Sequence, residues 1–335
     1  MSLNVLLIGY GFIAQGHEAH YRTNGQVTIA GVVDHSPQRR QAAEGHGLTV
    51  FADVATAVRE LDIDFFDICT PPTSHVRYIT MALDHGVSAL CEKPMFVDGS
   101  AVEADIFDRS IGGDVFAFPV HNYRFAPVFR RLQQVADKHV DGPAFGEVRV
   151  VRSGHARGVV DWLPDWRRDN AIANGGILTD HGPHAIYTAE MMAGSRVEAV
   201  SAWLHSESTD SDNETTVNLR LRFANGASTT VFLTWEADTR ESHYAMIFED
   251  GFVTVDDDHI HSTVPGFRFA EDIRSEFNDA SHSSWFGGVL HEYLSAYQDK
   301  KLRHSRLVEA RRVQRCISAA YSSASNNARW QAVES

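Results

Sequence analysis

The chain has 335 residues, 43% of them hydrophobic and 22% charged, with a formal net charge of −14. These values are typical of a globular protein of about two domains, and the acidic balance argues against nucleic acids and anionic membranes as partners. We find neither a stretch long enough to span a bilayer nor a signal peptide, so we expect a cytoplasmic protein. Three scattered cysteines predict free thiols and no metal centre.

The first apolar run, 5–8, stops at Gly9, and Gly11 follows. This pattern predicts a buried parallel strand, a tight turn and a helix that begins near Phe12 and Ile13. Gly9 permits the turn, and Gly11 lets a pyrophosphate approach the backbone at the positive end of the helix dipole. The alternative is an ordinary strand-to-helix turn.

A second apolar run, 28–33, ends in Asp34, roughly 20 residues beyond the glycines, where an acid accepts the ribose hydroxyls of a dinucleotide. Together the two runs favour a dinucleotide site. Asp34 favours NAD because its charge would repel a 2′-phosphate. Arg39 and Arg40 lie near enough in sequence to leave NADP open.

Short apolar runs and helical stretches continue to alternate up to about residue 120, which predicts parallel βαβ units. Strands are expected at 65–69, 87–91 and 115–120, with a helix over 76–85 that Gly86 ends. Segments 70–75 and 92–94 follow two of these strands. They therefore lie at the carboxyl edge of the sheet, where open α/β sheets bind ligands.

The second half has a different texture, in which period-2 segments dominate. A helix is expected over 127–139 and a helix-like run over 175–192, with Gly194 as its stop. Strands are expected at 146–151, 197–204, 214–223, 228–235, 244–248 and 252–255. Asn225-Gly226 and Asp250-Gly251 signal hairpins. We expect residues 259–282 to be irregular and 285–297 and 307–321 to form amphipathic helices. The pattern predicts a largely antiparallel α+β domain.

Three residues in these segments suit acid–base chemistry. Lys93 follows a strand at the functional edge of the sheet, where its ammonium could donate to a substrate oxygen; an exposed lysine paired with Glu92 is the alternative. Asp180 and His184 are four residues apart and would share one face of a helix. Pro183 between them either kinks that helix or marks its first turn. Asp180, His181 and His184 could also ligate a metal, but no further ligand cluster supports one.

The combined motifs resemble the Gfo/Idh/MocA oxidoreductase family. The resemblance rests on segments 9–14 (GYGFIA), 69–75 (CTPPTSH), 92–94 (EKP) and 175–184 (GGILTDHGPH), and it extends over nearly the whole chain. It implies an α/β protein: a doubly wound parallel Rossmann sheet over 1–120, and an α+β domain over 121–304 with a large, mostly antiparallel open sheet. A helix at about 305–325 would pack back on the first domain.

The resemblance also implies the site. Lys93, Asp180 and His184 match the catalytic positions, and the cofactor would be lined by Thr70, Pro71, His75, Glu92 and Lys93 besides the glycine turn. Asn122 and Arg124 fall where the chain crosses into the substrate domain. The chain departs from the family at Asn174, where a third glycine is frequent, and at Tyr187, where some members carry Asp.

The activity implied is hydride transfer between NAD(P) and a hydroxyl or ketone carbon of a sugar, amino sugar or cyclitol. His184 would be the acid–base, Lys93 would polarise the reacting oxygen, and Asp180 would hold a neighbouring hydroxyl or orient the base. A reductase of a non-sugar substrate, such as an imine or tetrapyrrole, and a non-catalytic NAD(P)-binding sensor remain alternatives.

Substrate contacts are expected from the segment before the catalytic run. The indoles of Trp162 and Trp166 could stack on a sugar face, and Asp165 and Arg167 could take hydroxyls or charged groups. The alternative is that the tryptophans anchor a loop on the core. His155 and Arg157 are weaker candidates of the same kind.

Finally, the sheet of the second domain is a candidate surface for a homodimer or homotetramer. Family members often associate in this way. Apolar residues expected on its strands are Trp203, Leu219, Leu221, Val231 and Leu233.

Overall fold

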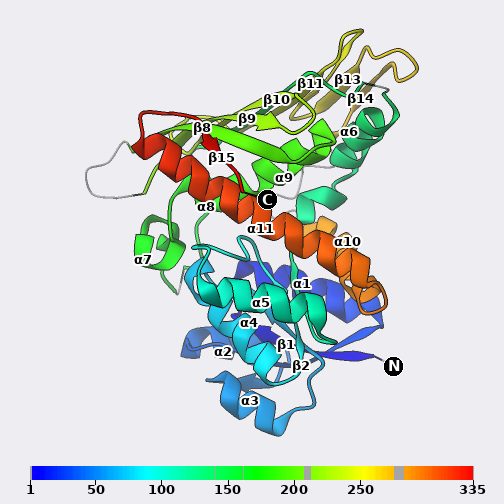
Figure 1. Ribbon diagram of the computed structural model, residues 1–335. Helices are drawn as coiled ribbons and strands as arrows, with labels where there is room; N and C mark the ends of the chain where they lie inside the picture. Colours follow the sequence, from blue (N-terminus) through cyan, green and yellow to red (C-terminus); the bar gives the residue numbers. More distant parts are fainter. Residues whose placement is uncertain (1, 140, 161, 207–212, 275–282, 335) are drawn as a thin grey trace.

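The protein has two domains, one above the other in Figure 1, each built on its own sheet. The computed structural model describes residues 2–139, 141–160, 162–206, 213–274 and 283–334. A six-stranded parallel sheet and a nine-stranded, mostly antiparallel sheet confirm the expected fold class. No helix in these ranges is long and apolar enough to cross a membrane.

The first sheet has the strand order β3-β2-β1-β4-β5-β6. Its strands are β1 (Leu3–Ile8), β2 (Val27–Val33), β3 (Val50–Phe51), β4 (Phe65–Ile68), β5 (Ser88–Cys91) and β6 (Ala117–Pro119). Its helices are α1 (Phe12–Asn24), α2 (Pro37–Gly45), α3 (Val54–Glu60), α4 (His75–Asp84) and α5 (Ala101–Gly112). The order reverses between β1 and β4, and ligands of doubly wound sheets bind at that point.

The second sheet has the order β14-β13-β12-β11-β7-β10-β9-β8-β15. Its strands are β7 (Phe145–Val151), β8 (Val197–His205), β9 (Thr216–Phe223), β10 (Ser228–Thr234), β11 (Glu241–Ile247), β12 (Phe252–Asp256), β13 (His259–Ser262), β14 (Phe269–Asp272) and β15 (Gln331–Ala332). β7 and β10 pair in parallel, whereas the other pairs are antiparallel. Gly226, with φ +90°, turns the expected hairpin between β9 and β10.

The region expected to be irregular contains two strands. β13 and β14 pair antiparallel with each other and extend the sheet beyond β12. The prediction was wrong there because an edge hairpin buries few side chains: in β13 only Ile260 and Ser262 are buried, which leaves a weak hydrophobic pattern. Residues 275–282 lie outside the described residues.

The helix expected over 175–192 is broken near its start. α8 (Ile177–Asp180) ends before His181, and α9 (Gly182–Ala193) begins with Pro183 in its first turn. Proline has no N–H to donate and is tolerated only in the first turn of a helix. Asp180 and His184 therefore belong to two helices and do not share one helical face.

The last two long helices join the domains. α10 (Phe286–Ala296) contributes Phe286, Leu290 and Tyr293 to the core of the first sheet, although the predicted boundary assigned it to the second domain. α11 (Lys300–Ser325) contacts α5 and β6 in one domain and α9 and β8 in the other, and Figure 1 shows it crossing the junction. The remaining helices, α6 (Pro127–Lys138) and the short α7 (Asn170–Ala173), belong to the second domain.

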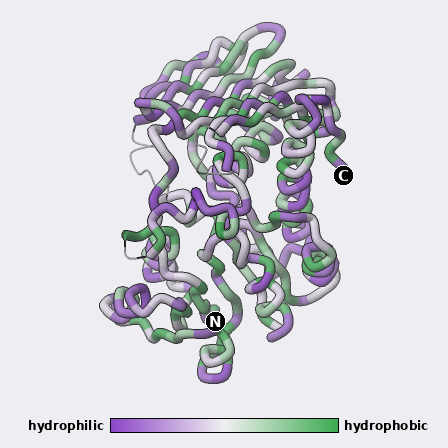
Figure 2. The backbone as a smooth tube through the Cα atoms, turned by 90° about the vertical axis from the view of Figure 1, so that its left-hand side faces the viewer, coloured by the Kyte–Doolittle hydropathy of each residue, from purple (hydrophilic) through white to green (hydrophobic). Residues whose placement is uncertain are grey.

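Helices cover one face of the second sheet. Along its strands hydrophilic and hydrophobic residues alternate, as Figure 2 shows in purple and green. Leu219, Leu221, Val231 and Leu233 are fully buried in the core, so they lie on the face that the helices cover and not on the face open to a partner chain. Only Trp203 of that group, 53% exposed, lies on the open face.

Candidate active site

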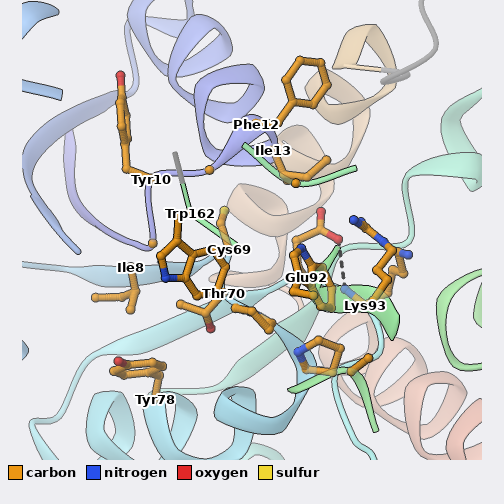
Figure 3. A pocket seen from close by; sticks show the side chains of 18 of the residues that line it. Ile8, Tyr10, Phe12, Ile13, Cys69, Thr70, Tyr78, Glu92, Lys93 and Trp162 are labelled. Atoms are coloured by element: carbon orange, nitrogen blue, oxygen red, sulfur yellow. Dashed lines mark hydrogen bonds between the residues drawn. The ribbon is translucent and has the colours of Figure 1, made fainter. Parts of the chain in front are cut away.

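A cavity of about 550 Å³ lies between the carboxyl edge of the first sheet and the start of α9. Its volume is in the range of pockets that hold cofactors and small ligands. The glycine turn, Asp34, Lys93, Asp180 and His184 all line it. Figure 3 shows one part of this wall, with Tyr10, Phe12 and Ile13 from the first turn and Glu92 and Lys93 from the loop after β5.

The glycine turn leaves room for a ligand at the start of α1. Gly9 has φ +87°, and a Cβ there would lie 2.9 Å from Cγ2 of Thr70, so glycine is required. At Gly11 a Cβ would meet no atom within 4 Å. No side chain caps the first turn of α1. Free N–H groups facing open space at a helix start fit the diphosphate of a dinucleotide.

Asp34 lies at the end of β2, on the same cavity. Its carboxylate accepts hydrogen bonds from the backbone N–H of Tyr10 and of Ser36, at 2.8 Å each, which ties the glycine turn to the second strand. Arg40 donates to the backbone carbonyls of Asp34 and His35, whereas Arg39 lines the cavity.

Thr70, Pro71 and Glu92 line the cavity as expected, but His75 does not. His75 is fully buried; its Nδ1 lies 2.8 Å from the carbonyl oxygen of Pro94 and its Nε2 2.7 Å from that of Thr70. The side chain of His75 therefore has no surface on the cavity in this structure. His75 instead connects the two loops that carry the contacts.

Lys93 and Asp180 form an ion pair between the domains. Nζ of Lys93 donates to Oδ1 of Asp180 at 2.9 Å and to its backbone carbonyl at 2.7 Å. On the other side, Nε of Arg167 and Nδ1 of His181 each lie 3.3 Å from Oδ2 of Asp180. Burial opposes ionisation of Asp180, yet Lys93 and Arg167 hold its pKa well below the usual range. Asp180 thus remains a carboxylate that aligns two cations.

His184 lies in the first turn of α9 and lines the same cavity. Its Nδ1 lies 2.8 Å from Oη of Tyr187, and its ring stacks on that of Tyr123, with 4.2 Å between centroids. Burial lowers the pKa of His184 well below the usual histidine range, and the charges of Lys93 and His181 act in the same direction. His184 is therefore a neutral imidazole at neutral pH.

The turn that carries these residues is held by Glu214, which sequence reasoning missed. Oε1 of Glu214 accepts the backbone N–H of Gly176 at 3.0 Å and of Leu178 at 2.9 Å, and Tyr321 of α11 donates to the same oxygen. A Cβ on Gly176 would lie 1.9 Å from the backbone oxygen of Glu214. The glycine pair was a visible signal of close approach, but its partner lies 38 residues away.

Both tryptophans line the cavity, but they pack against different neighbours. Trp166 lines the cavity with the guanidinium of Arg167 over its ring, 4.3 Å from the centroid. Trp162 packs edge-on against His35, the residue after Asp34, with 5.4 Å between centroids. In Figure 3 it lies among Ile8, Cys69 and Thr70. Trp162 also lines the cavity, against the wall that the first domain contributes, and its expected stacking on a substrate stays a prediction.

Two of the expected substrate residues do not line the cavity. Arg124 pairs with Glu309 of α11, which His121 also contacts at 2.7 Å. Burial opposes ionisation of Glu309, but Arg124 and His121 lower its pKa to about 2. His155 lies 3.5 Å from Asp165 and packs edge-on against Trp235. Both side chains turn towards protein partners. Asn122 does line the cavity, and its Oδ1 is buried without a hydrogen-bond partner among the described residues.

Two family models match the chain. Residues 3–106 match the model described as "Oxidoreductase family, NAD-binding Rossmann fold", and residues 133–254 match the GFO/IDH/MocA C-terminal domain. The chain belongs to the GFO/IDH/MocA oxidoreductase family. Its first domain is accordingly an NAD-binding Rossmann domain, in agreement with the glycine turn and Asp34.

The chain is 27% identical over 280 residues to levoglucosan dehydrogenase of Pseudarthrobacter phenanthrenivorans, covering 72% of this chain and 70% of that protein. It is 28% identical over 204 residues to D-glucoside 3-dehydrogenase of Escherichia coli, covering 60% and 57%. The chain spans 58% of a further relative, oxidoreductase P35 of Formosa agariphila, at 26% identity over 55% of this chain. Several such matches thus cover less than two thirds of the relative.

Solved structures share the fold over the whole chain. GenD2 from gentamicin A biosynthesis, in complex with NAD, superposes with a TM-score of 0.85 at 22% identity, covering 100% of this chain and 97% of that one. Levoglucosan dehydrogenase in complex with NADH and levoglucosan superposes with a TM-score of 0.83 at 19% identity, covering 100% of both chains.

Proposed function

We propose that this oxidoreductase uses NAD to interconvert a hydroxyl and a ketone on a sugar, amino sugar or cyclitol. One observation carries the proposal: Lys93, Asp180 and His184, from two domains, line the cavity that also contains the glycine turn and Asp34. The relatives named as dehydrogenases of levoglucosan and of D-glucosides support this substrate class. NADP stays open because Arg39 lines the cavity near Asp34.

The cofactor would be held by the turn at 9–13, by Asp34 and by the loops at Thr70–Pro71 and Glu92–Lys93. When bound, its nicotinamide supplies the hydride chemistry. Trp162, packed on His35, would cover the cofactor on the side of Asp34. This role replaces the substrate contact that its sequence context suggested.

The chain's own residues would move the proton and hold the substrate. His184 would take the hydroxyl proton in oxidation and return it in reduction. Lys93, fixed by Asp180, would donate to the same oxygen. Asn122, Trp166 and Arg167 would contact the rest of the substrate, and the unpaired Oδ1 of Asn122 suits a hydroxyl.

The open face of the second sheet supports a further proposal, a homodimer or homotetramer. Phe145 and Ile247 are paired neighbours on this face, and each is at least 36% exposed, as is Trp203. Light scattering of wild type and Trp203→Arg tests this. We expect a smaller particle for the variant; a monomeric wild type would contradict the proposal.

A panel assay tests the activity. Purified protein is mixed with NAD+ or NADP+ and with inositols, aldoses, anhydrosugars and amino sugars, and nicotinamide absorbance is followed. We expect reduction of NAD+ with one class of polyol. Binding of NAD(H) without turnover of any member of the panel would contradict the proposal and favour a non-catalytic sensor or a reductase of another substrate.

A further inference from the structure

The ring of His184 is fixed by two tyrosines, and no carboxylate contacts it among the residues that the structure describes. Oη of Tyr187 lies 2.8 Å from Nδ1, and Tyr123 stacks on one face of the ring. Tyr187 is one turn further along α9, so a single helix sets the geometry of the pair. Because Nδ1 is occupied, Nε2 is the nitrogen left for a ligand in the cavity.

Tyr187 is itself held firmly. Its Oη accepts the backbone N–H of Tyr123 at 3.1 Å, and its ring stacks on His121, with 4.3 Å between centroids. His121 in turn contacts Glu309 of α11. Burial raises the pKa of Tyr187 well above its usual range, so the side chain stays a neutral phenol.

A hydroxyl suits a partner of a proton-transferring imidazole. It can accept a hydrogen bond from Nδ1–H and, after rotation, donate one to bare Nδ1, whereas a carboxylate can only accept. A phenol also adds no charge, so it stabilises the imidazolium less than a carboxylate would.

The charges around His184 come from every element packed against it. The titratable groups facing it are Lys93 after β5, Asp180 of α8 and His181 after it, His121 and Tyr123 after β6, and Tyr187. Asp180 already engages Lys93 and Arg167. The neighbourhood therefore disfavours a protonated His184, and a charged acceptor placed at Nδ1 would act in the opposite direction.

We propose that Tyr187 is the positioning residue for His184, holding Nδ1 through a neutral hydroxyl so that Nε2 exchanges the proton with the substrate. The proposal rests on the proposed dehydrogenase function. In oxidation the O–H bond of the substrate breaks and its proton binds Nε2. The C–H bond of the carbon that bears this hydroxyl breaks as well, and its hydride is transferred to NAD+. The ketone and the imidazolium remain, and the bond from Nδ1–H to Tyr187 persists throughout.

The pH dependence follows with a definite sign. Protonation below the pKa of His184 removes the base, so kcat/KM for oxidation falls on the acid side. Because burial and the cations around it lower this pKa, the fall begins below the usual histidine range. A carboxylate at position 187 would favour the imidazolium and move the fall to higher pH.

Two variants and one control test the proposal. Tyr187→Phe keeps the ring but removes the hydroxyl, and Tyr187→Asp replaces it with a charged acceptor. Tyr293→Phe removes another buried hydroxyl, which lies 3.1 Å from Oη of Tyr297 in the core of the first domain, and controls for the loss of a buried phenol. Two quantities are measured: kcat/KM against pH, and the titration midpoint of His184 by NMR of 15N-histidine, assigned with His184→Gln.

We expect Tyr187→Phe to lose roughly 10–100-fold in kcat/KM, as when other imidazoles lose the group that orients them, and to keep a low midpoint. Tyr187→Asp should raise the titration midpoint of His184 and move the acid-side fall of kcat/KM to higher pH by a similar amount. Tyr293→Phe should change neither quantity. Full kcat/KM in Tyr187→Phe, or an unchanged midpoint in Tyr187→Asp, would overturn the proposal.

The titration midpoint of His184 is measured by NMR without a substrate. A failure of the dehydrogenase function can therefore be distinguished from a failure of the role of Tyr187. A raised midpoint in Tyr187→Asp with no turnover of any polyol by wild type would refute the dehydrogenase function and leave the pairing of Tyr187 with His184 intact. Turnover by wild type with an unchanged midpoint would refute the role of Tyr187 alone. If Tyr187→Asp fails to fold, the loss in kcat/KM of Tyr187→Phe is compared with that of Tyr293→Phe. A loss in Tyr187→Phe no larger than in Tyr293→Phe would overturn the proposal.

Discussion

The cofactor turn at 9–13 and the catalytic turn at 175–184 both place a glycine pair before a helix, yet the glycines do different work. At Gly11 the space a side chain would fill is open. At Gly176 it is filled by the backbone of Glu214, 1.9 Å from the position of a Cβ. The same sequence signal therefore marks room for a ligand in one place and close packing of the chain in the other.

The comparison extends to the partners of each turn. The cofactor turn is held by Asp34, whose carboxylate accepts a hydrogen bond from the backbone N–H of Tyr10, 24 residues earlier in the chain. The catalytic turn is tied to Glu214, Tyr321 and Lys93, with Lys93 contacting Asp180 across 87 residues. One end of the cavity is a local motif, and the other is assembled from both domains.

The largest effect is expected at the catalytic turn itself. His184→Ala removes the side chain that we propose as the acid–base, so kcat should fall by roughly 10²–10⁴-fold. Binding of NAD(H), measured by fluorescence titration, should stay within a factor of about two because the glycine turn is untouched. His155→Ala, a histidine outside the cavity, is the control. A loss in His184→Ala no larger than in the control would remove His184 from the mechanism.

The glycine comparison predicts opposite outcomes for one substitution. Gly176→Ala forces the backbone at Glu214 to move, and we expect a loss of about 1–3 kcal/mol in the free energy of unfolding, read from urea denaturation. Gly11→Ala should fold normally but weaken NAD binding by roughly 10–100-fold, the loss of about one charge-assisted hydrogen bond. Equal stability and equal cofactor affinity in the two variants would refute the distinction between the turns.

The choice between NAD and NADP tests the cofactor turn and Asp34. Asp34→Asn keeps oxygen and shape but removes the charge that repels a 2′-phosphate. We expect the preference for NAD over NADP to fall by about tenfold, close to 1.4 kcal/mol. Competition of NAD+ and NADP+ in the oxidation assay measures this ratio. An unchanged ratio would mean that Arg39, and not Asp34, sets the preference.

The smallest effect is expected at Trp162. Trp162→Ala removes an aromatic contact with His35, and a loss of about 0.5–1.5 kcal/mol corresponds to a few-fold weaker NAD(H) binding. The KM for the polyol should not change. Phe substitution should restore most of the affinity. A selective rise in the KM for the polyol would instead support the substrate contact that the sequence suggested.

The fold and the three central residues could be predicted because their signals are local. Apolar runs, glycines and a terminal acid define the first domain, and Lys93, Asp180 and His184 lie in short motifs. The supporting contacts could not be predicted: Glu214, Tyr321 and Glu309 have no pattern of their own and act across long sequence separations. Sequence also does not reveal which way a side chain turns: Arg124, His155 and His75 turn towards protein partners outside the cavity.

The most direct test of the account is to follow the substrate's own hydrogen. A polyol that turns over is deuterated at the reacting carbon, and the NADH formed by wild type and by His184→Gln is analysed by mass spectrometry. We predict deuterium in the nicotinamide of NADH from wild type, and the same labelled product at a rate roughly 10²–10⁴-fold lower in the variant. Unlabelled NADH from wild type, or an unchanged rate in the variant, would contradict hydride transfer with His184 as the base.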